Sequence, residues 1–319
     1  SRGGDTVIVG STFDGNTAAS GGAVGNLRSN LAIVNSTFVN NRALAHGGGA
    51  IALDGLNPDH GKVFTLCGVV ARNNRASVEG GAVYRYGYPG ESSTIDSTTL
   101  DGNTAEDPDR AHAGGLYHHT DSPGQMPLTL TNSTISNNVS ARGAGALFFY
   151  NSPVTLVNVT IAGNRAESSL AGAIAANGVP GTVQNCTIAD NHADHASSFA
   201  GAIIGGGGLT LQNTLIANNT AGNEWNPVSC TDTAASGKDN LQHPAEQASG
   251  QADLPCAPGI DFADPLLGPL ADNGGPTFTM APGTGSPARG AGTDCPATDQ
   301  RGVERPGGAC DLGAFQTAP

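Results

Sequence analysis

The feature that most constrains this chain is an asparagine that recurs near the end of a short apolar run. Each copy is preceded by similar text, as in Ser36-Thr37-Phe38-Val39-Asn40-Asn41 and Asn132-Ser133-Thr134-Ile135-Ser136-Asn137-Asn138. Its eight copies, 25 to 35 residues apart, are Asn16, Asn41, Asn74, Asn103, Asn138, Asn164, Asn191 and Asn219. A repeat of this length is typical of a solenoid, in which each unit packs against its neighbours.

A second motif of small residues and an aliphatic residue follows each asparagine except the last. Its copies are Gly21-Gly22-Ala23-Val24, Gly48-Gly49-Ala50-Ile51, Gly80-Gly81-Ala82-Val83, Gly114-Gly115-Leu116-Tyr117, Gly145-Ala146-Leu147, Gly172-Ala173-Ile174 and Gly201-Ala202-Ile203. Short β-branched and apolar runs lie between Gly, Asn and Asp, and no segment sustains a helical period. The sequence therefore predicts an all-β chain, a right-handed single-stranded parallel β-helix whose coils stack at about 4.8 Å. The asparagines should form a ladder at one corner, and the glycines should allow unusual backbone angles at another.

The repeats suggest two parts, with β-helix coils over residues 1–220 and a C-terminal cap over 221–319. The cap should fold over the last coil and cover its open edge. Two cysteine pairs bracket polar segments there and predict disulfides that pin a region with little core of its own. The pairs are Cys230 with Cys256 and Cys295 with Cys310. Cys67 and Cys186 lie four coils apart, about 19 Å at the strand spacing, so they are predicted to be buried thiols.

The motifs resemble two groups of bacterial surface proteins. Phe followed by Asn and then Gly-Gly-Ala-aliphatic, as in Phe13–Asn16 with Gly21–Val24, resembles the repeat of chlamydial polymorphic outer-membrane proteins over roughly residues 5–220. The C-terminal motifs resemble the corresponding stretch of choice-of-anchor Q proteins. They are Asp272-Asn273-Gly274-Gly275-Pro276-Thr277, Thr298-Asp299-Gln300-Arg301-Gly302 and Cys310-Asp311-Leu312-Gly313-Ala314-Phe315. These resemblances imply an exported bacterial β-helix protein, extracellular or at the cell surface.

The charge and hydropathy of the chain limit the kinds of partner that it is expected to bind. The formal net charge is −13 and only two lysines occur, Lys62 and Lys238, so nucleic acid is not an expected partner. No stretch of 18 apolar residues exists, so no membrane-spanning segment is expected. Other copies of the chain, glycans, or host or cell-surface proteins remain as partners.

Aromatic residues gather on three successive coils. Alignment on the glycine motif forms two columns that should point outward: Tyr84, Tyr117 and Phe148 in one, and Tyr86, His119 and Tyr150 in the other. Such a platform could stack sugar rings or receive a protein. The alternative is that the insertion Glu106–His112 covers it. The same alternation turns Arg85 and His118 inward, which suggests a bend in the strand.

The expected function is a structural or adhesive protein outside the bacterial cell. It could assemble end to end into filaments, because no amphipathic helix shields the first strand, Val7–Val9, if Ser1 is the mature terminus. The alternative is a polysaccharide-degrading lyase or glycosidase that uses Glu106, Asp109 and His112. No cofactor and no metal site are expected.

Overall fold

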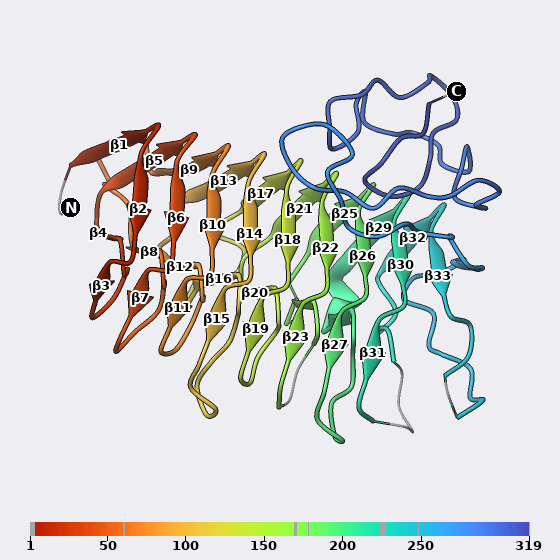
Figure 1. Ribbon diagram of the computed structural model, residues 1–319, viewed down its shortest axis with the longest axis horizontal. Coiled ribbons are helices and arrows are strands. Elements are labelled where there is room, and N and C mark those ends of the chain that lie inside the picture. Colours follow the sequence, from red (N-terminus) through yellow and green to blue (C-terminus); the bar gives the residue numbers. More distant parts are fainter. Residues whose placement is uncertain are drawn as a thin grey trace.

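The computed structural model describes residues 4–59, 61–168, 171–177, 179–223, 228–247 and 249–318. The chain coils through four sheets, which we number in the order in which each coil visits them (Figure 1). Within the described residues, the named strands pair in parallel, each with its counterpart in the next coil. The parallel β-helix predicted from the repeat is confirmed.

Sheets 1 and 2 form two long sides of the coil. Sheet 1 contains β1 (Asp5–Val9), β5 (Asn30–Val34), β9 (Val63–Cys67), β13 (Ser92–Asp96), β17 (Leu128–Thr131), β21 (Val154–Val157), β25 (Gly181–Gln184), β29 (Leu209–Gln212) and β32 (Ser236–Lys238). Sheet 2 contains β2 (Thr12–Asp14), β6 (Thr37–Val39), β10 (Val70–Arg72), β14 (Thr99–Asp101), β18 (Thr134–Ser136), β22 (Thr160–Ala162), β26 (Thr187–Ala189), β30 (Leu215–Ala217), β33 (Leu241–His243) and β34 (Asp261–Phe262).

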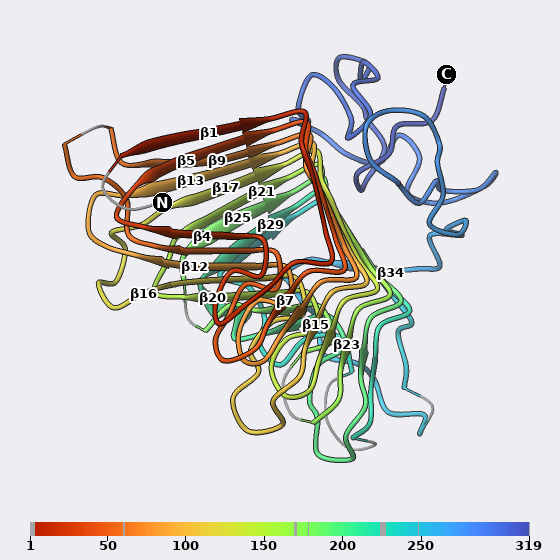
Figure 2. The same ribbon diagram turned by 60° about the vertical axis from the view of Figure 1, so that its left-hand side comes forward.

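Sheets 3 and 4 complete each coil and are joined by protruding loops (Figure 2). Sheet 3 contains β3 (Thr17–Ala18), β7 (Arg42–Ala43), β11 (Arg75–Ala76), β15 (Thr104–Ala105), β19 (Val139–Ser140), β23 (Arg165–Ala166), β27 (His192–Ala193) and β31 (Thr220–Ala221). Sheet 4 contains β4 (Val24–Leu27), β8 (Ile51–Asp54), β12 (Val83–Gly87), β16 (Leu116–Thr120), β20 (Leu147–Tyr150), β24 (Ile174–Ala175) and β28 (Ile203–Ile204), and a 3-10 turn, η1 (Gly206–Gly208), follows it.

The core consists of inward side chains stacked from coil to coil. Ile135 lies in register with Ile161, and both are fully buried. Phe13 and Phe38 stack with 4.8 Å between their ring centroids. Because parallel register places like positions over each other, the inward aliphatic and aromatic residues form columns that join into a continuous core.

The recurring asparagines form the predicted ladder. Asn74 accepts two hydrogen bonds at Oδ1 from Asn41, one from its side-chain amide at 2.9 Å and one from its backbone N–H at 3.0 Å. Asn74 in turn donates to the carbonyl of Phe38, at 3.0 Å. The side-chain bonds continue from Asn16 to Asn219. The members after Asn16 are fully buried, so these bonds satisfy amides that water cannot reach.

The two glycines of the second motif have different roles. Gly48 has a φ of +72°, as expected for a residue that allows an unusual backbone angle. Gly49 has no such angle, but a Cβ there would lie 2.1 Å from the carbonyl oxygen of Gly81 in the next coil. The second glycine is therefore required by the close approach of successive coils.

The cysteines are mostly where the sequence predicts them. The two disulfides, Cys230–Cys256 and Cys295–Cys310, are confirmed. Cys186 is a buried thiol that occupies the Ser position of the motif and donates to the carbonyl of Gln184. Cys67 is half-buried at the end of β9, so the prediction of a buried thiol is wrong there.

The C-terminal region takes an unexpected path. Strands β32, β33 and β34 continue sheets 1 and 2 beyond residue 220. Residues 264–318 then lie along the side of the later coils, not over the last coil as expected (Figures 1 and 2). Met280 packs there on small outward residues of sheet 2, Ala162, Ala189 and Ala217, which leave room for a covering segment.

Gln300, in the Thr298–Gly302 motif, fastens this region to sheet 2. Its side chain is buried, and its Oε1 accepts a 2.7 Å hydrogen bond from the hydroxyl of Thr160. Its Nε2 lies 2.9 Å from the hydroxyl of Thr134 and donates to the carbonyl of Phe278 at the same distance. The motif thus ties the C-terminal region to two successive coils.

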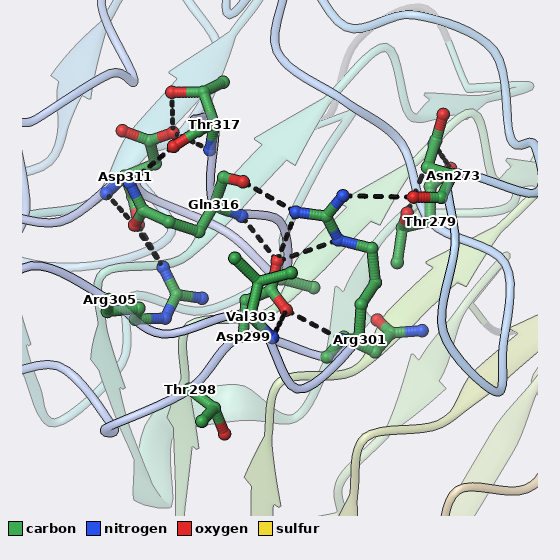
Figure 3. Close-up of polar contacts among 12 residues, drawn as sticks. Asn273, Thr279, Thr298, Asp299, Arg301, Val303, Arg305, Asp311, Gln316 and Thr317 are labelled. Carbon is green, nitrogen blue, oxygen red and sulfur yellow. Dashed lines mark hydrogen bonds and ion pairs between the residues drawn. The ribbon is translucent and has the colours of Figure 1, made fainter. Parts of the chain in front are cut away.

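Asp299 organises the same region from within (Figure 3). Its carboxylate is fully buried and accepts hydrogen bonds from the Arg301 guanidinium at 2.7 and 2.9 Å and from the backbone N–H of Gln316 at 2.9 Å. The Arg301 guanidinium also lies 3.5 Å from the centroid of the Phe315 ring. Burial lowers the pKa of nearby Arg305 to about 10, and its guanidinium donates to the carbonyls of Asp311 and Gly313.

Candidate functional site

The outer face of sheet 4 carries the aromatic columns, and their predicted register is correct. Tyr84, Tyr117 and Phe148 pair on successive coils, and we call them the covered column. Tyr86, His119 and Tyr150 pair in the same way. With Tyr88, which follows β12, these three form what we call the open row.

The covered column is a stack of rings that other residues shield. The ring centroids of Tyr84 and Tyr117 are 5.6 Å apart, and those of Tyr117 and Phe148 are 5.3 Å apart. Tyr117 and Phe148 are only 7% and 6% exposed. His112 lies against both, with its ring centroid 6.0 Å from Tyr117 and 4.9 Å from Phe148. His112, the last residue of the Glu106–His112 insertion, therefore covers Tyr117 and Phe148, which is one part of the patch that the alternative interpretation expects the insertion to cover.

The open row remains accessible at its two ends. Tyr88 and Tyr150 are 40% and 38% exposed. Adjacent ring centroids are 5.3 Å apart for Tyr88 and Tyr86, 5.2 Å for Tyr86 and His119, and 4.8 Å for His119 and Tyr150, each pair edge to face. The row thus presents ring faces and edges across three coils.

Polar groups hold the rings of the open row in place. The Tyr86 hydroxyl donates to Asp121, and this bond raises the pKa of Tyr86 to about 12. His119 Nε2 lies 3.1 Å from the Asp121 carboxylate, without the alignment of a hydrogen bond. Its Nδ1 is 2.9 Å from the Tyr117 hydroxyl. Burial lowers the pKa of His119, although Asp121 opposes the shift.

Beneath these rings, sheet 4 turns charged side chains inward without a bend. Arg85 and His118 pair in register on β12 and β16, and both are fully buried. Arg85 forms a 2.6 Å ion pair with Glu91, which also accepts a 2.7 Å bond from the backbone N–H of Leu56. His118 Nε2 lies 3.0 Å from the Ser93 hydroxyl. The predicted bend is wrong, because β12 and β16 are continuous strands within which Arg85 finds Glu91 and the neutral His118 finds Ser93.

Two carboxylates beside the open row have no counterpart in the sequence prediction. Asp54 lies in register with Tyr86 on β8 and accepts a 3.3 Å hydrogen bond from the Tyr88 hydroxyl. Glu79, in the loop before sheet 4, has a pKa raised by burial. The glycine register could have placed both residues, since Asp54 falls in the column of Tyr86 and Glu79 directly precedes Gly80 of the second motif.

The alternative catalytic residues have separate surroundings. Glu106 forms ion pairs with Arg42 at 3.0 Å and Arg75 at 3.1 Å, on the side of sheet 3. Asp109 accepts a bond from Arg142 at its backbone carbonyl. His112 packs on the covered column, and burial lowers its pKa. Among the described residues, no group of three His, Cys, Asp or Glu side chains could hold a metal ion.

Comparisons with known proteins do not identify a family or a function for this chain. No family model matches the chain, and no curated protein matches it. In the described part of the chain, we find no helix with the length and apolar character needed to cross a membrane. Two disulfides are the kind of crosslink that persists in an oxidising compartment.

Proposed function

We propose that this chain is an extracellular β-helix protein that adheres to carbohydrate chains through the open row of sheet 4. The observation that carries the proposal is the row of rings across three coils, flanked by the carboxylates of Asp54 and Asp121. Tyrosine presents an apolar face together with a polar hydroxyl, and a sugar ring has the matching C–H face and hydroxyl rim. The disulfides support an extracellular location, and the surface-protein resemblance of the motifs agrees with it.

A pull-down of the purified protein with insoluble polysaccharides tests the proposal. Replacing Tyr86 and Tyr150 with Ala should weaken binding about tenfold or more, since each ring contact contributes roughly 0.5–1.5 kcal/mol. Phe262→Ala is the matched control, because Phe262 is 37% exposed but lies on β34 in sheet 2. Equal binding by the double variant and the control would reject the open row as the carbohydrate surface.

Cleavage is the competing role, and the same mixture distinguishes it. An enzyme would release new reducing ends or unsaturated products from the polysaccharide, and the double variant Glu106→Gln, Asp109→Asn would lose this activity. That result would reject adhesion and support the polysaccharide-degrading enzyme suggested by the acidic insertion. The two arginines that neutralise Glu106 argue against its service as a free general base. End-to-end filament assembly stays a prediction from the sequence.

A further inference from the structure

The covered column stops at Tyr84, and a pocket of about 380 Å³ lies at that end. The positions that continue the column on the two earlier coils are Ala52 and Gly25, in register with Tyr84. Neither has a ring to place on Tyr84, although the other face of Tyr84 stacks on Tyr117 at 5.6 Å. The pocket therefore occupies the next ring position of the stack.

Polar groups surround this ring position on both sides. Ser20, His46 and Glu79 reach it from the loops that enter sheet 4, and Asp54 borders it from β8. Gly47 completes the wall, because a Cβ there would lie 2.6 Å from Cδ2 of Tyr84. A pocket of this volume is at the small end of ligand sites, which suits a single ring.

We propose that this pocket binds one pyranose residue of a neutral or amino-bearing polysaccharide, stacked on Tyr84 and hydrogen-bonded by Asp54, Glu79 and His46. The inference rests on the proposed carbohydrate function. It adds the class of sugar and the place on the protein where one end of the bound polysaccharide is held. Asp54 belongs to the same column as Tyr86, so a chain held in the pocket can continue along the open row.

The charges around the pocket select among sugars. Asp54 and Glu79 are carboxylates, and neither Lys nor Arg is among the lining residues, so a uronic acid would meet repulsion there, while Arg110 acts on Glu79 from outside the pocket. Hydroxyl and ammonium groups donate to carboxylates in charge-assisted bonds. An aromatic side chain of a protein partner would fill the ring position but would leave most of these polar groups without donors.

Titration calorimetry with three hexasaccharides tests the sugar class. Cellohexaose is neutral, the chitosan hexamer is cationic, and hexagalacturonate is acidic. Wild-type protein should bind the first two and bind hexagalacturonate at least about tenfold more weakly. Preference for hexagalacturonate would overturn the inference, while failure of wild type to bind any of the three would count against both the inference and the proposed function.

Filling the pocket tests its location. Ala52→Phe should place the protein's own ring on Tyr84 and weaken binding of cellohexaose and the chitosan hexamer by about tenfold or more. Ala52→Leu fills less of the pocket and serves if the phenyl variant does not fold. Glu79→Gln should weaken the chitosan hexamer more than cellohexaose. If the Ala52 variants bind like wild type while loss of Tyr86 and Tyr150 still weakens binding, the pocket is wrong and the carbohydrate function stands.

Discussion

The outer faces of sheets 2 and 4 contrast in what covers them. On the later coils of sheet 2, the third position of each strand is Ala162, Ala189 or Ala217, and the chain's own C-terminal region packs on it. On sheet 4, large rings project from the middle coils, and a single loop residue, His112, shields only one of the two columns. Small outward residues leave room for another segment of the same chain to pack on the sheet. Projecting rings instead form a surface that a ligand can contact.

The contrast also exists within sheet 2. The early coils carry Asp14, Arg72 and Asp101 at the position that is Ala in the later coils. The C-terminal region packs on the Ala positions, where no charged group has to lose its water.

The largest expected effect concerns the buried ion pair that organises the cover. Asp299→Ala leaves the Arg301 guanidinium and the Gln316 N–H without their acceptor, so the C-terminal region should lose about 3–5 kcal/mol of stability. Hydrogen exchange should then accelerate in residues 264–318 while the core strands stay protected. Asp294→Ala is the control, since the Asp294 pair with Lys238 is exposed and is screened by solvent. Equal exchange in both variants would contradict a cover held by Asp299.

A charge on the covered part of sheet 2 should break the contrast within that sheet. Ala189→Asp places a carboxylate under Met280, and the expected cost is more than about 2 kcal/mol, measured by urea unfolding. Val39→Asp occupies the same column on an early coil and should change stability by less than about 0.5 kcal/mol. Comparable costs at the two positions would show that cover does not depend on the small residues.

Parallel stacking explains why much of this was predictable. Once the Asn and glycine motifs give the register, a local pattern specifies contacts 25 to 35 residues apart, such as Asn41 with Asn74 and Tyr84 with Tyr117. The path of residues 264–318 was not predictable in this way, because that segment has no repeat. The Ala162, Ala189 and Ala217 series was its one signal in the sequence.

The candidate site divides along the same line. Both aromatic columns followed from the register, but the cover by His112 depends on an insertion that the neighbouring coils lack. The inward Arg85 was correctly placed by alternation, yet its partner Glu91 lies outside the strand and gave no pattern to find. Loop residues determine how exposed the site is, and their contacts can be identified only in the folded structure.

A smaller effect should reveal the charged interior beneath sheet 4. Burial and then the charge of Arg85 hold the pKa of His118 well below its usual value. An unfolded His gains a proton as pH falls through about 6.5, whereas folded His118 does not, so acid favours unfolding. From pH 7.5 to 5.5, this residue should remove on the order of 1 kcal/mol of stability. Urea midpoints of wild type and His118→Phe at both pH values measure it.

His112 and His119 have pKa values that burial also lowers, so they contribute to the same acid slope in both proteins. The informative quantity is therefore the difference in slope between wild type and His118→Phe. An identical slope in the two proteins would mean that His118 gains its proton in the folded state at the same pH as in the unfolded state, which contradicts a pKa lowered by burial and by the charge of Arg85.

The smallest effect on stability concerns Cys186. Its reactivity toward an alkylating reagent, compared with that of Cys67, distinguishes a buried thiol from a half-buried one. Cys186→Ser should change stability by less than about 0.5 kcal/mol, because Ser36 and Ser133 occupy the equivalent position and make the same bond to a carbonyl two residues earlier. Burial raises the pKa of Cys186 to about 12, so its thiol should react with an alkylating reagent only after unfolding. Cys67 is half-buried and should react in the folded protein. Mass mapping of native and denatured samples measures both, and labelling of Cys186 in the native protein would show that the solenoid interior opens where the register places a closed core.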